Sequence, residues 1–390
     1  MPFPFSSNME DIKRFWYTKF KLPANARQLK IGLVLTLTTA TLFICCWWIS
    51  MYSGAQMCTQ ILSTLVVPKK DDLQNASIPE YDKYVGSMVM ACGGLGNMMW
   101  RFASLYGIGR QLKRTPYIEE SWQCMKDSHA EALEIFPEYG KRMRFVATNS
   151  TNLSKINFGS QGCCKYDNVD RLKNETNEYI LLNSDYFQDY RYFNAVRNEI
   201  RFPFQWSKPV LSKVEKYGRF LFGPDSSHKL CVHTRMGDFV NFQISSKPNF
   251  TESALDFAYK NLLAQFGNVS VVLLGEDKEF LLSIKYDETL NSQMYIPHKM
   301  SRGEDMAFAT LYCDSLLITA QASTFSWWIG YLMRANWDPQ VGRIFFNSDF
   351  KGNSPGGTYS MDNFPPHWIP LRLTMIPRIE VENTTRSRVD

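Results

Sequence analysis

Hydrophobic and polar positions divide the 390-residue chain into a uniformly apolar N-terminal segment and a patterned body. Residues 31–52 (IGLVLTLTTATLFICCWWISMY) carry no charge, and about 20 such residues span the hydrocarbon core of a bilayer as a helix. Residues 1–30 hold six Lys or Arg against two acidic residues, and basic flanks stay on the cytosolic side. We therefore expect a cytosolic tail at 1–30, a transmembrane signal anchor at 31–52, a stem at 53–82 and a luminal body.

From residue 83 onward, short apolar runs alternate with stretches of helical spacing. The runs predict a first strand from Lys83 and further strands at 115–118, 179–183, 229–234, 269–274, 294–296, 316–319 and 343–346. Helices are expected from about residue 97 and at 189–200, 253–266, 278–284, 305–312 and 326–334. Residues from about 120 to 175 show no regular pattern.

Strand–helix alternation of this kind predicts parallel sheets that are covered by helices. We expect an α/β fold with two facing Rossmann-like domains, at 83–225 and 226–375, followed by a tail at 376–390. Ligands of such folds bind beyond the carboxyl ends of the strands, so the cleft between the two domains is the expected site.

The positive charge of the chain is concentrated in its tail. The formal net charge is +5, of which residues 1–30 contribute +4 (six basic minus two acidic) and residues 31–390 only +1. A nucleic-acid partner requires a broad basic face, so the nearly neutral body argues against one.

Glycosylation sequons and cysteines agree with a luminal body. All sequons follow the apolar segment, at Asn75, Asn149, Asn152, Asn174, Asn249, Asn268 and Asn383. Seven of the nine cysteines also follow it, and a lumen favours disulfides. An odd number leaves at least one cysteine free or joined to another chain. Cys58, just past the predicted span, is a candidate for linking a homodimer.

A glycine-rich loop follows the first predicted strand, in KYVGSMVMACGGLGNMMW. Glycines such as Gly94 and Gly96 let the backbone approach a phosphate, and the N-terminus of a helix that starts near Asn97 adds partial positive charge. The spacing nearly fits a dinucleotide fingerprint, but Met99 occupies the third glycine position and is too large for the close contact required there. A tight turn without a ligand remains the alternative.

A second group of polar side chains comes at the end of the strand in CVHTRMGDFV. Arg235 can make paired, charge-assisted hydrogen bonds to a phosphate, with Asp238 holding its guanidinium. His233 can donate to a base or ribose. The alternative is a structural Arg–Asp pair beside a buried histidine.

Two more strand ends carry polar residues. Glu276 and Asp277 follow strand 269–274 and can accept from sugar hydroxyls or a guanine edge, or lie in a solvated loop. Ser323 and Thr324 stand where a helix begins, so they suit helix capping and equally an anion at the helix N-terminus.

Four segments now resemble the α-1,2-fucosyltransferase family, and its divergent nematode-type members most of all. GGLGNMMWRFASLYGIGRQL is similar to the family's Gly-x-Leu-Gly-Asn-Gln segment, and DYFQDYRYFNAVRNEIRFPF to its Gly-Tyr-Phe-Gln-Ser segment. VHTRMGDFV is similar to its Val-His-Val-Arg-Arg-Gly-Asp-Tyr motif, and STFSWWIGYL to its Ser-Thr-Phe-(Gly/Ser)-Trp-Trp motif. The segments occur in the family's order and cover most of residues 87–332.

The resemblance implies two facing Rossmann-like halves (GT-B type) and inverting transfer of L-fucose from GDP-fucose to a terminal galactose-like sugar through an α-1,2 link. It implies a Golgi membrane protein without a metal or other cofactor. Arg235 would grip the donor diphosphate, His233 the nucleotide, and Asp305 would lie near the nucleoside. The remaining positions that match donor-side loops are Gly94, Gly96, Asn97, Ser323, Thr324 and Phe325.

Three positions depart from the family pattern. Met236 replaces the second arginine, which removes one positive charge from the donor site. Met98 stands in place of glutamine and Asp185 in place of glycine, and both affect the expected choice of acceptor. Met236 also favours the alternative of a catalytically inactive paralogue that binds a glycan or a nucleotide sugar.

The chemistry of the residues agrees with the resemblance. Departure of a nucleoside diphosphate builds negative charge that must be stabilised in the transition state. The sequence has no Asp-x-Asp metal loop, so Arg235 and the predicted helix N-termini at Asn97 and Ser323 are expected to do this. The base candidates are Asp238, Glu276 and Asp277.

Overall fold

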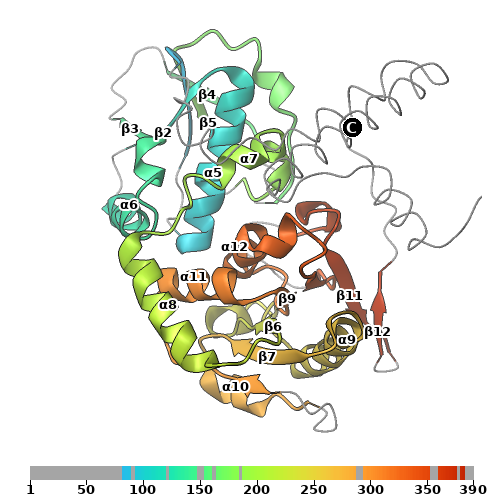
Figure 1. Cartoon of the computed structure of the whole chain (residues 1–390). Coiled ribbons are helices and arrows are strands. Elements are labelled where there is room, and N and C mark those ends of the chain that lie inside the picture. Colours follow the sequence, from blue (N-terminus) through green and yellow to red (C-terminus); the bar gives the residue numbers. More distant parts are fainter. Residues whose placement is uncertain are drawn as a thin grey trace, which may run out of the picture. The chain divides into compact units, whose positions relative to one another are not determined.

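The structure is a computed structural model of the whole chain, and its described residues are 81–88, 93–119, 123–146, 153–159, 164–183, 187–286, 293–351, 359–375 and 378–382 (Figure 1). They belong to one compact unit that spans Ala76–Asp390. The predicted tail at 1–30, the predicted transmembrane segment, residues 53–80 and Cys58 lie outside the described residues. Within those ranges, no helix combines the length and the apolar character that a membrane crossing requires.

The first sheet has five parallel strands in the order β3-β2-β1-β5-β4. Their bounds are β1 Tyr84–Ser87, β2 Thr115–Glu119, β3 Arg144–Val146, β4 Leu153–Ile156 and β5 Tyr179–Leu182. β1 lies at the centre and pairs with β5 over four residues, where the rings of Tyr84 and Tyr179 stack 4.7 Å apart. Helix α5 (Leu95–Leu112) follows β1 directly and packs on both β1 and β2.

The region predicted to be irregular, about 120–175, contains regular elements. Helix α6 (Gln123–Ile135) and strands β3 and β4 lie there, with 3₁₀ turns at Tyr139–Lys141 and Val169–Leu172. The apolar pattern of α6 is sparse because few of its side chains are buried, among them Met125, Ala132 and Ile135. A helix that buries so little leaves a weak periodic signal in the sequence.

The helix predicted at 189–200 is wrong for most of its length. The chain forms two 3₁₀ turns, Tyr190–Tyr192 and Asn194–Val196, before the short helix α7 (Arg197–Ile200). The side chain of Asp189 accepts from the backbone N–H of Arg191. Such local bonds from an aspartate compete with helix formation.

The second sheet has seven strands in the order β12-β11-β10-β9-β6-β7-β8. Their bounds are β6 His228–His233, β7 Val269–Leu274, β8 Met294–Tyr295, β9 Ser315–Ile318, β10 Ile344–Asn347, β11 Ile369–Leu373 and β12 Ile379–Val381. All neighbours are parallel except β11 and β12. The predicted strands lie close to these bounds, but β11 and β12 were missed. β12 falls inside the range 376–390 that was predicted as a tail.

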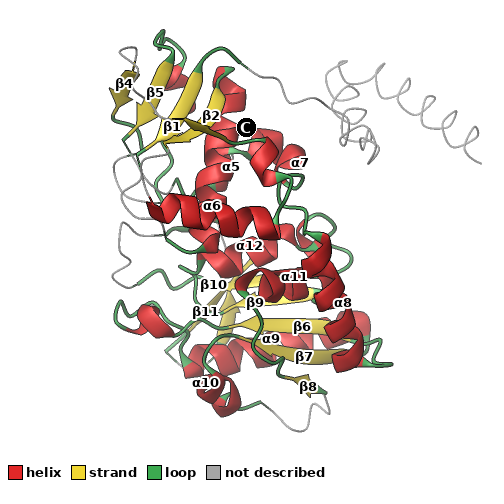
Figure 2. Ribbon diagram, turned by 90° about the vertical axis from the view of Figure 1, so that its left-hand side faces the viewer, coloured by secondary structure: helices red, strands yellow, loops and turns green. Residues whose placement is uncertain are grey.

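Helices cover both faces of the second sheet. Their bounds are α8 Lys208–Phe222, α9 Pro248–Phe266, α10 Lys278–Ser283, α11 Arg302–Tyr312 and α12 Thr324–Leu332. Leu230 and Val232 of β6 pack in the cluster that contains α9, whereas Cys231 packs in the cluster that contains α11 and α12. Helix α8, which the sequence analysis missed, lies along α11 (Figure 2). Two sheets, parallel except for the β11–β12 pair, together with these helices confirm the predicted α/β class.

Strand β7 illustrates why the second sheet was predictable. All six of its side chains are buried, as expected for a β-branched run inside a parallel sheet. Burial of each Val or Leu side chain contributes about 1.5–3 kcal/mol of transfer free energy. The apolar run of β7 is therefore enough to predict a buried strand.

An aromatic cluster joins α5 to α12. Trp100 of α5 lies 4.1 Å from Trp327 and 5.5 Å from Trp328, measured between ring centroids. Phe193 stacks on Trp328 at 6.0 Å. All four rings are fully buried, so elements of the first and second sheets share one core.

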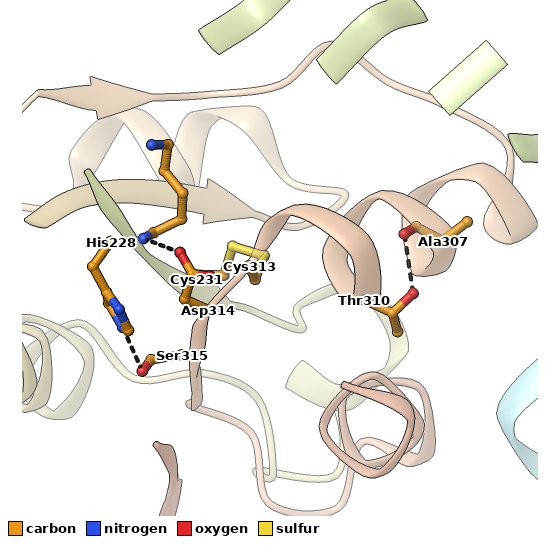
Figure 3. The surroundings of a disulfide bond; sticks show 8 residues. His228, Cys231, Ala307, Thr310, Cys313, Asp314 and Ser315 are labelled. Atoms are coloured by element: carbon orange, nitrogen blue, oxygen red, sulfur yellow. Dashed lines mark hydrogen bonds between the residues drawn. A yellow bond between two sulfur atoms is a disulfide. The ribbon is translucent and has the colours of Figure 1, made fainter. Parts of the chain in front are cut away.

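A disulfide joins the second sheet to the end of α11 (Figure 3). Cys231 of β6 is bonded to Cys313, which ends α11, across a separation of 82 residues. Beside it, the Lys229 N–H donates to the carboxylate of Asp314 at 2.8 Å. The bond therefore ties the strand that carries His233 to the helix that carries Asp305. The sequence analysis had left the pairing open.

Candidate active site

The glycine loop brings the N-terminus of α5 against that of α12. Gly93 has a φ of +67°, a conformation that favours glycine, and a Cβ there would lie 2.8 Å from the Asn97 Cβ. A Cβ on Gly96 would lie 2.8 Å from the Thr324 carbonyl carbon and from the Phe325 N. The loop glycines thus serve a turn and a close helix contact, while Gly94 is exposed.

The start of α12 is set by Ser323. This residue is 2% exposed, and its hydroxyl accepts from the Ser326 N–H at 3.3 Å. Ser323 therefore caps α12, one of the two roles that the sequence left open, and its predicted contact with an anion stays a prediction. Thr324 and Phe325 are half-buried, and they remain the residues of this loop with exposed surface.

His233 lies at the end of β6, close to the first turn of α12. Its Nδ1 is 2.7 Å from the Ser326 Oγ, and its ring centroid is 5.5 Å from that of Phe325. Burial, with a smaller contribution from the positive charge of Arg235, lowers the pKa of His233 to about 3. The imidazole is therefore neutral throughout the physiological pH range.

Arg235 lies two residues further on, where Ser246 fixes its backbone. The Arg235 N–H donates to the Ser246 Oγ at 2.9 Å, and the Ser246 N–H donates to the Arg235 carbonyl at 2.9 Å. The guanidinium donates to Glu276 at 3.0 Å and to Asp238 at 2.8 Å, and it lies 5.0 Å above the Phe239 ring. The predicted Arg–Asp pair is confirmed, and Glu276 joins it.

The charge of this cluster is negative as a whole. One guanidinium against the carboxylates of Asp238 and Glu276 gives −1. Met236, at the position of the family's second arginine, packs against the apolar cluster that contains α9. Arg235 is about one third exposed and the two carboxylates are about half exposed or more, so water screens these interactions.

Asp305 lies in the first turn of α11. Burial raises its pKa to about 7; the charge of Glu304 adds to this, whereas Lys278 and Lys299 oppose it.

Asp277, the base candidate next to Glu276 in the sequence, caps helix α10. Its carboxylate accepts a hydrogen bond from the Phe280 N–H at 2.9 Å. One oxygen of Asp277 therefore serves the cap, whereas Asp238 and Glu276 are the base candidates that contact Arg235.

Arg302 is a cation near the glycine loop that the sequence analysis missed. Its Nη1 would lie 3.7 Å from a Cβ on Gly94, and its Nη2 donates to Glu131 of α6 at 2.6 Å. Arg302 is the first residue of α11, so the only sequence signal was its place before the predicted helix.

The predicted residues fall into three groups. Gly96 lies against Thr324 and Phe325, Asn97 follows Gly96 in the first turn of α5, and Phe325 lies against His233. Arg235, Asp238 and Glu276 form the second group, which continues the same strand end as His233. Asp305 forms the third.

Other predicted positions differ in exposure. The sequon residues Asn174, Asn249 and Asn268 are exposed. The other sequons, at Asn75, Asn149, Asn152 and Asn383, and the departure Asp185 lie outside the described residues. Met98 is 2% exposed and belongs to the core. In the described ranges, no cluster of His, Cys, Asp or Glu is arranged to hold a metal ion.

Comparison with known proteins places the chain in a family. No protein-family model matches it. It is 30% identical over 305 residues to a Caenorhabditis elegans protein that carries the provisional name galactoside 2-α-L-fucosyltransferase svh-11, covering 75% of this chain and 80% of that protein. A C. elegans galactoside 2-α-L-fucosyltransferase is 28% identical over 335 residues, or 78% of this chain and 81% of that protein. The crystal structure of the fucosyltransferase NodZ from Bradyrhizobium superposes with a TM-score of 0.44 at 14% identity, over 66% of this chain and 94% of that chain. The chain belongs to the galactoside 2-α-L-fucosyltransferase family, which confirms the resemblance seen in its motifs.

Proposed function

We propose that the chain transfers L-fucose from GDP-fucose to a terminal galactose-like residue of a glycan, forming an α-1,2 link with inversion. The observation that carries the proposal is the family membership, together with the Arg235–His233 strand end beside the start of α12. The names of the relatives support fucose as the transferred sugar and a galactoside as the acceptor.

Arg235 would stabilise the departing diphosphate. A guanidinium has five N–H donors, and two of them are used by Asp238 and Glu276. Three remain for phosphate oxygens. Because charge grows on the diphosphate as the sugar bond breaks, these donors stabilise the transition state more than the bound donor. The N-termini of α5 and α12 add partial positive charge.

His233 would donate one hydrogen bond to the donor nucleotide. Within the described structure, the Nδ1 of His233 is the hydrogen-bond partner of the Ser326 hydroxyl. Donation by the hydroxyl satisfies its hydrogen and places the ring proton on Nε2. The neutral imidazole then presents an N–H, so the residue binds without titrating.

Asp238 or Glu276 would accept the proton of the attacking acceptor hydroxyl. Both carboxylates are accessible to solvent, and both contact the guanidinium. The developing sugar cation is oxocarbenium-like, as in glycoside hydrolysis, and inversion places the attacking hydroxyl, with its base, on the face opposite the departing diphosphate.

The same proposal includes the setting of the enzyme. We infer a GT-B arrangement with the donor between the two sheets, a type II anchor at residues 31–52 and a luminal body in the Golgi. The Cys231–Cys313 disulfide supports an oxidising compartment. A homodimer linked through Cys58 and catalysis without a metal belong to the proposal as well.

The test is release of GDP from GDP-fucose by the purified full-length chain, across β-galactoside acceptors, with and without a chelator. Arg235→Ala should lower turnover by at least ~100-fold, the order seen when a main stabiliser of transition-state charge is removed. Arg372→Ala is the matched control, because Arg372 also pairs with a carboxylate, Glu382, but lies on β11, next to the edge strand β12. Equal turnover for Arg235→Ala and wild type would refute the role of Arg235. Binding of GDP-fucose without release of GDP would identify an inactive paralogue.

A further inference from the structure

A buried chain of hydrogen bonds ends on the carboxamide of Asn97. The Gln188 Nε2 donates to the Asn97 Oδ1 at 3.0 Å, and the Gln188 Oε1 accepts from the Tyr359 hydroxyl. Gln188 and Tyr359 are each 5% exposed. The three residues come from distant segments, 91 and 171 residues apart. The mechanism above gives Gln188 and Tyr359 no role.

The phenol decides which way both carboxamides point. In the described part of the chain, Gln188 is the hydrogen-bond partner of the Tyr359 hydroxyl. If the phenol donates, its hydrogen is used and the Nε2 of Gln188 faces Asn97. In the reversed arrangement the phenol accepts, and a buried hydrogen is left unpaired, which is the costlier state. Burial raises the pKa of Tyr359 far above its ordinary value, so the hydroxyl keeps its hydrogen.

The position of Gln188 is itself strongly constrained. Phe187, directly before it, has a φ of +40°, which is uncommon for a bulky residue and persists only where the surroundings impose it. The Asn363 Nδ2 donates to the Gln188 carbonyl at 3.2 Å and to the Asp189 carboxylate at 3.1 Å. Tyr359 and Asn363 therefore hold the side chain and the backbone of Gln188 from one segment.

These contacts fix which end of the Asn97 carboxamide faces Gln188 and which end remains free to bind a ligand. Its Oδ1 is occupied by Gln188, and its Nδ2 lies against Gly93, where a side chain would collide with it. The Nδ2 makes no hydrogen bond within the described ranges. Asn97 thus presents N–H donors, rather than a carbonyl oxygen, in the first turn of α5, directly after Gly96, which lies against Thr324 and Phe325.

We propose that Gln188 and Tyr359 are positioning residues that aim the Asn97 N–H donors at a phosphate oxygen of the nucleoside diphosphate. This rests on the proposed function, which supplies that ligand. Amide N–H groups suit an anionic oxygen, and the N-terminus of α5 favours negative charge at the same place.

The test is a double-mutant cycle read by GDP binding to the full-length chain in calorimetry. Tyr359→Phe should weaken GDP binding about fivefold, the effect of losing control over one hydrogen bond. Asn97→Ala should weaken it at least as much, and Tyr359→Phe should have no further effect in the Asn97→Ala background. Tyr331→Phe is the matched control, because Tyr331 is 4% exposed and its hydroxyl has no partner in the described structure. It should bind GDP like wild type.

Two results would overturn the positioning role. The first is that Tyr359→Phe weakens GDP binding by the same factor in the wild-type and the Asn97→Ala background. The second is that Tyr331→Phe weakens GDP binding as much as Tyr359→Phe does. The transfer assay separates this proposal from the proposed function. If the Tyr359→Phe and Asn97→Ala effects on GDP binding are coupled but the chain transfers no fucose, the positioning role is supported and the proposed activity is refuted. A wild-type chain that binds no GDP would overturn both.

Discussion

Gly96 and Gly94 occupy the same sequence motif, but the structure predicts opposite outcomes for alanine at the two positions. A Cβ on Gly96 would lie 2.8 Å from two backbone atoms of Thr324 and Phe325. Carbon atoms in ordinary contact are about 3.5–4.0 Å apart. The N-termini of α5 and α12 would have to separate by roughly 1 Å, because backbone atoms have no other rotamer to adopt.

The cost of this separation follows from the packing behind it. Helix α5 is held in place by the contact of Trp100 with Trp327, so the shift is an overpacking defect of about 1–3 kcal/mol. The better helix propensity of alanine returns up to about 1 kcal/mol. We expect Gly96→Ala to lower the free energy of unfolding by ~1.5 kcal/mol, or the melting temperature by roughly 4 °C.

Gly94→Ala is the matched control. Its φ is −88°, which alanine adopts readily, and the nearest atom to its Cβ would be the Arg302 Nη1 at 3.7 Å. We expect a change of less than about 0.5 kcal/mol. Thermal unfolding of the three purified chains, followed by circular dichroism, makes the comparison. Wild-type stability in Gly96→Ala, or equal losses in both variants, would show that the contact between α5 and α12 is not as described.

Two further predictions concern Asp305 and the disulfide. Because the pKa of Asp305 is raised to about 7, its carboxylate loses charge as the pH falls through 7, and kcat/KM for GDP-fucose should fall on that side. Asp305→Asn should flatten this limb of a pH–rate profile, and an unchanged limb would exclude Asp305 as its source. The Cys231–Cys313 bond closes a loop of 82 residues, for which chain entropy gives about 4.5 kcal/mol. The double variant Cys231→Ala, Cys313→Ala should lose up to this free energy of unfolding in urea titrations, and a loss below ~1 kcal/mol would contradict the entropic account.

The parts of the fold that were predicted from sequence are those whose signal is local. Strand β7 matched its predicted range because its apolar run is continuous, and α9 was found because its buried residues recur at helical spacing. Helix α6 was missed because it buries too little for its pattern to show, and β12 was missed because it is a three-residue edge strand.

The site shows the same division. The Arg235–Asp238 pair lies within three residues and was predicted, whereas the bond from Gln188 to Asn97 joins positions 91 residues apart and leaves no trace in either segment. Ser323 was ambiguous, because capping and anion binding require the same residue type. The distance to the Ser326 N–H shows that Ser323 caps α12, whereas its role toward an anion stays a prediction.

Asn363 imposes an order of assembly on the polypeptide as it leaves the ribosome. Its side chain binds the backbone carbonyl of Gln188, which is synthesised 175 residues earlier. At ordinary translation rates this separation corresponds to about 10–35 s. Throughout that interval the amide that holds the Gln188 backbone does not yet exist, so the segment around residues 187–189 lacks this contact. A premature stop codon before position 359 would therefore remove contacts made by the half of the protein that is synthesised first, so the damage would extend far from the truncation.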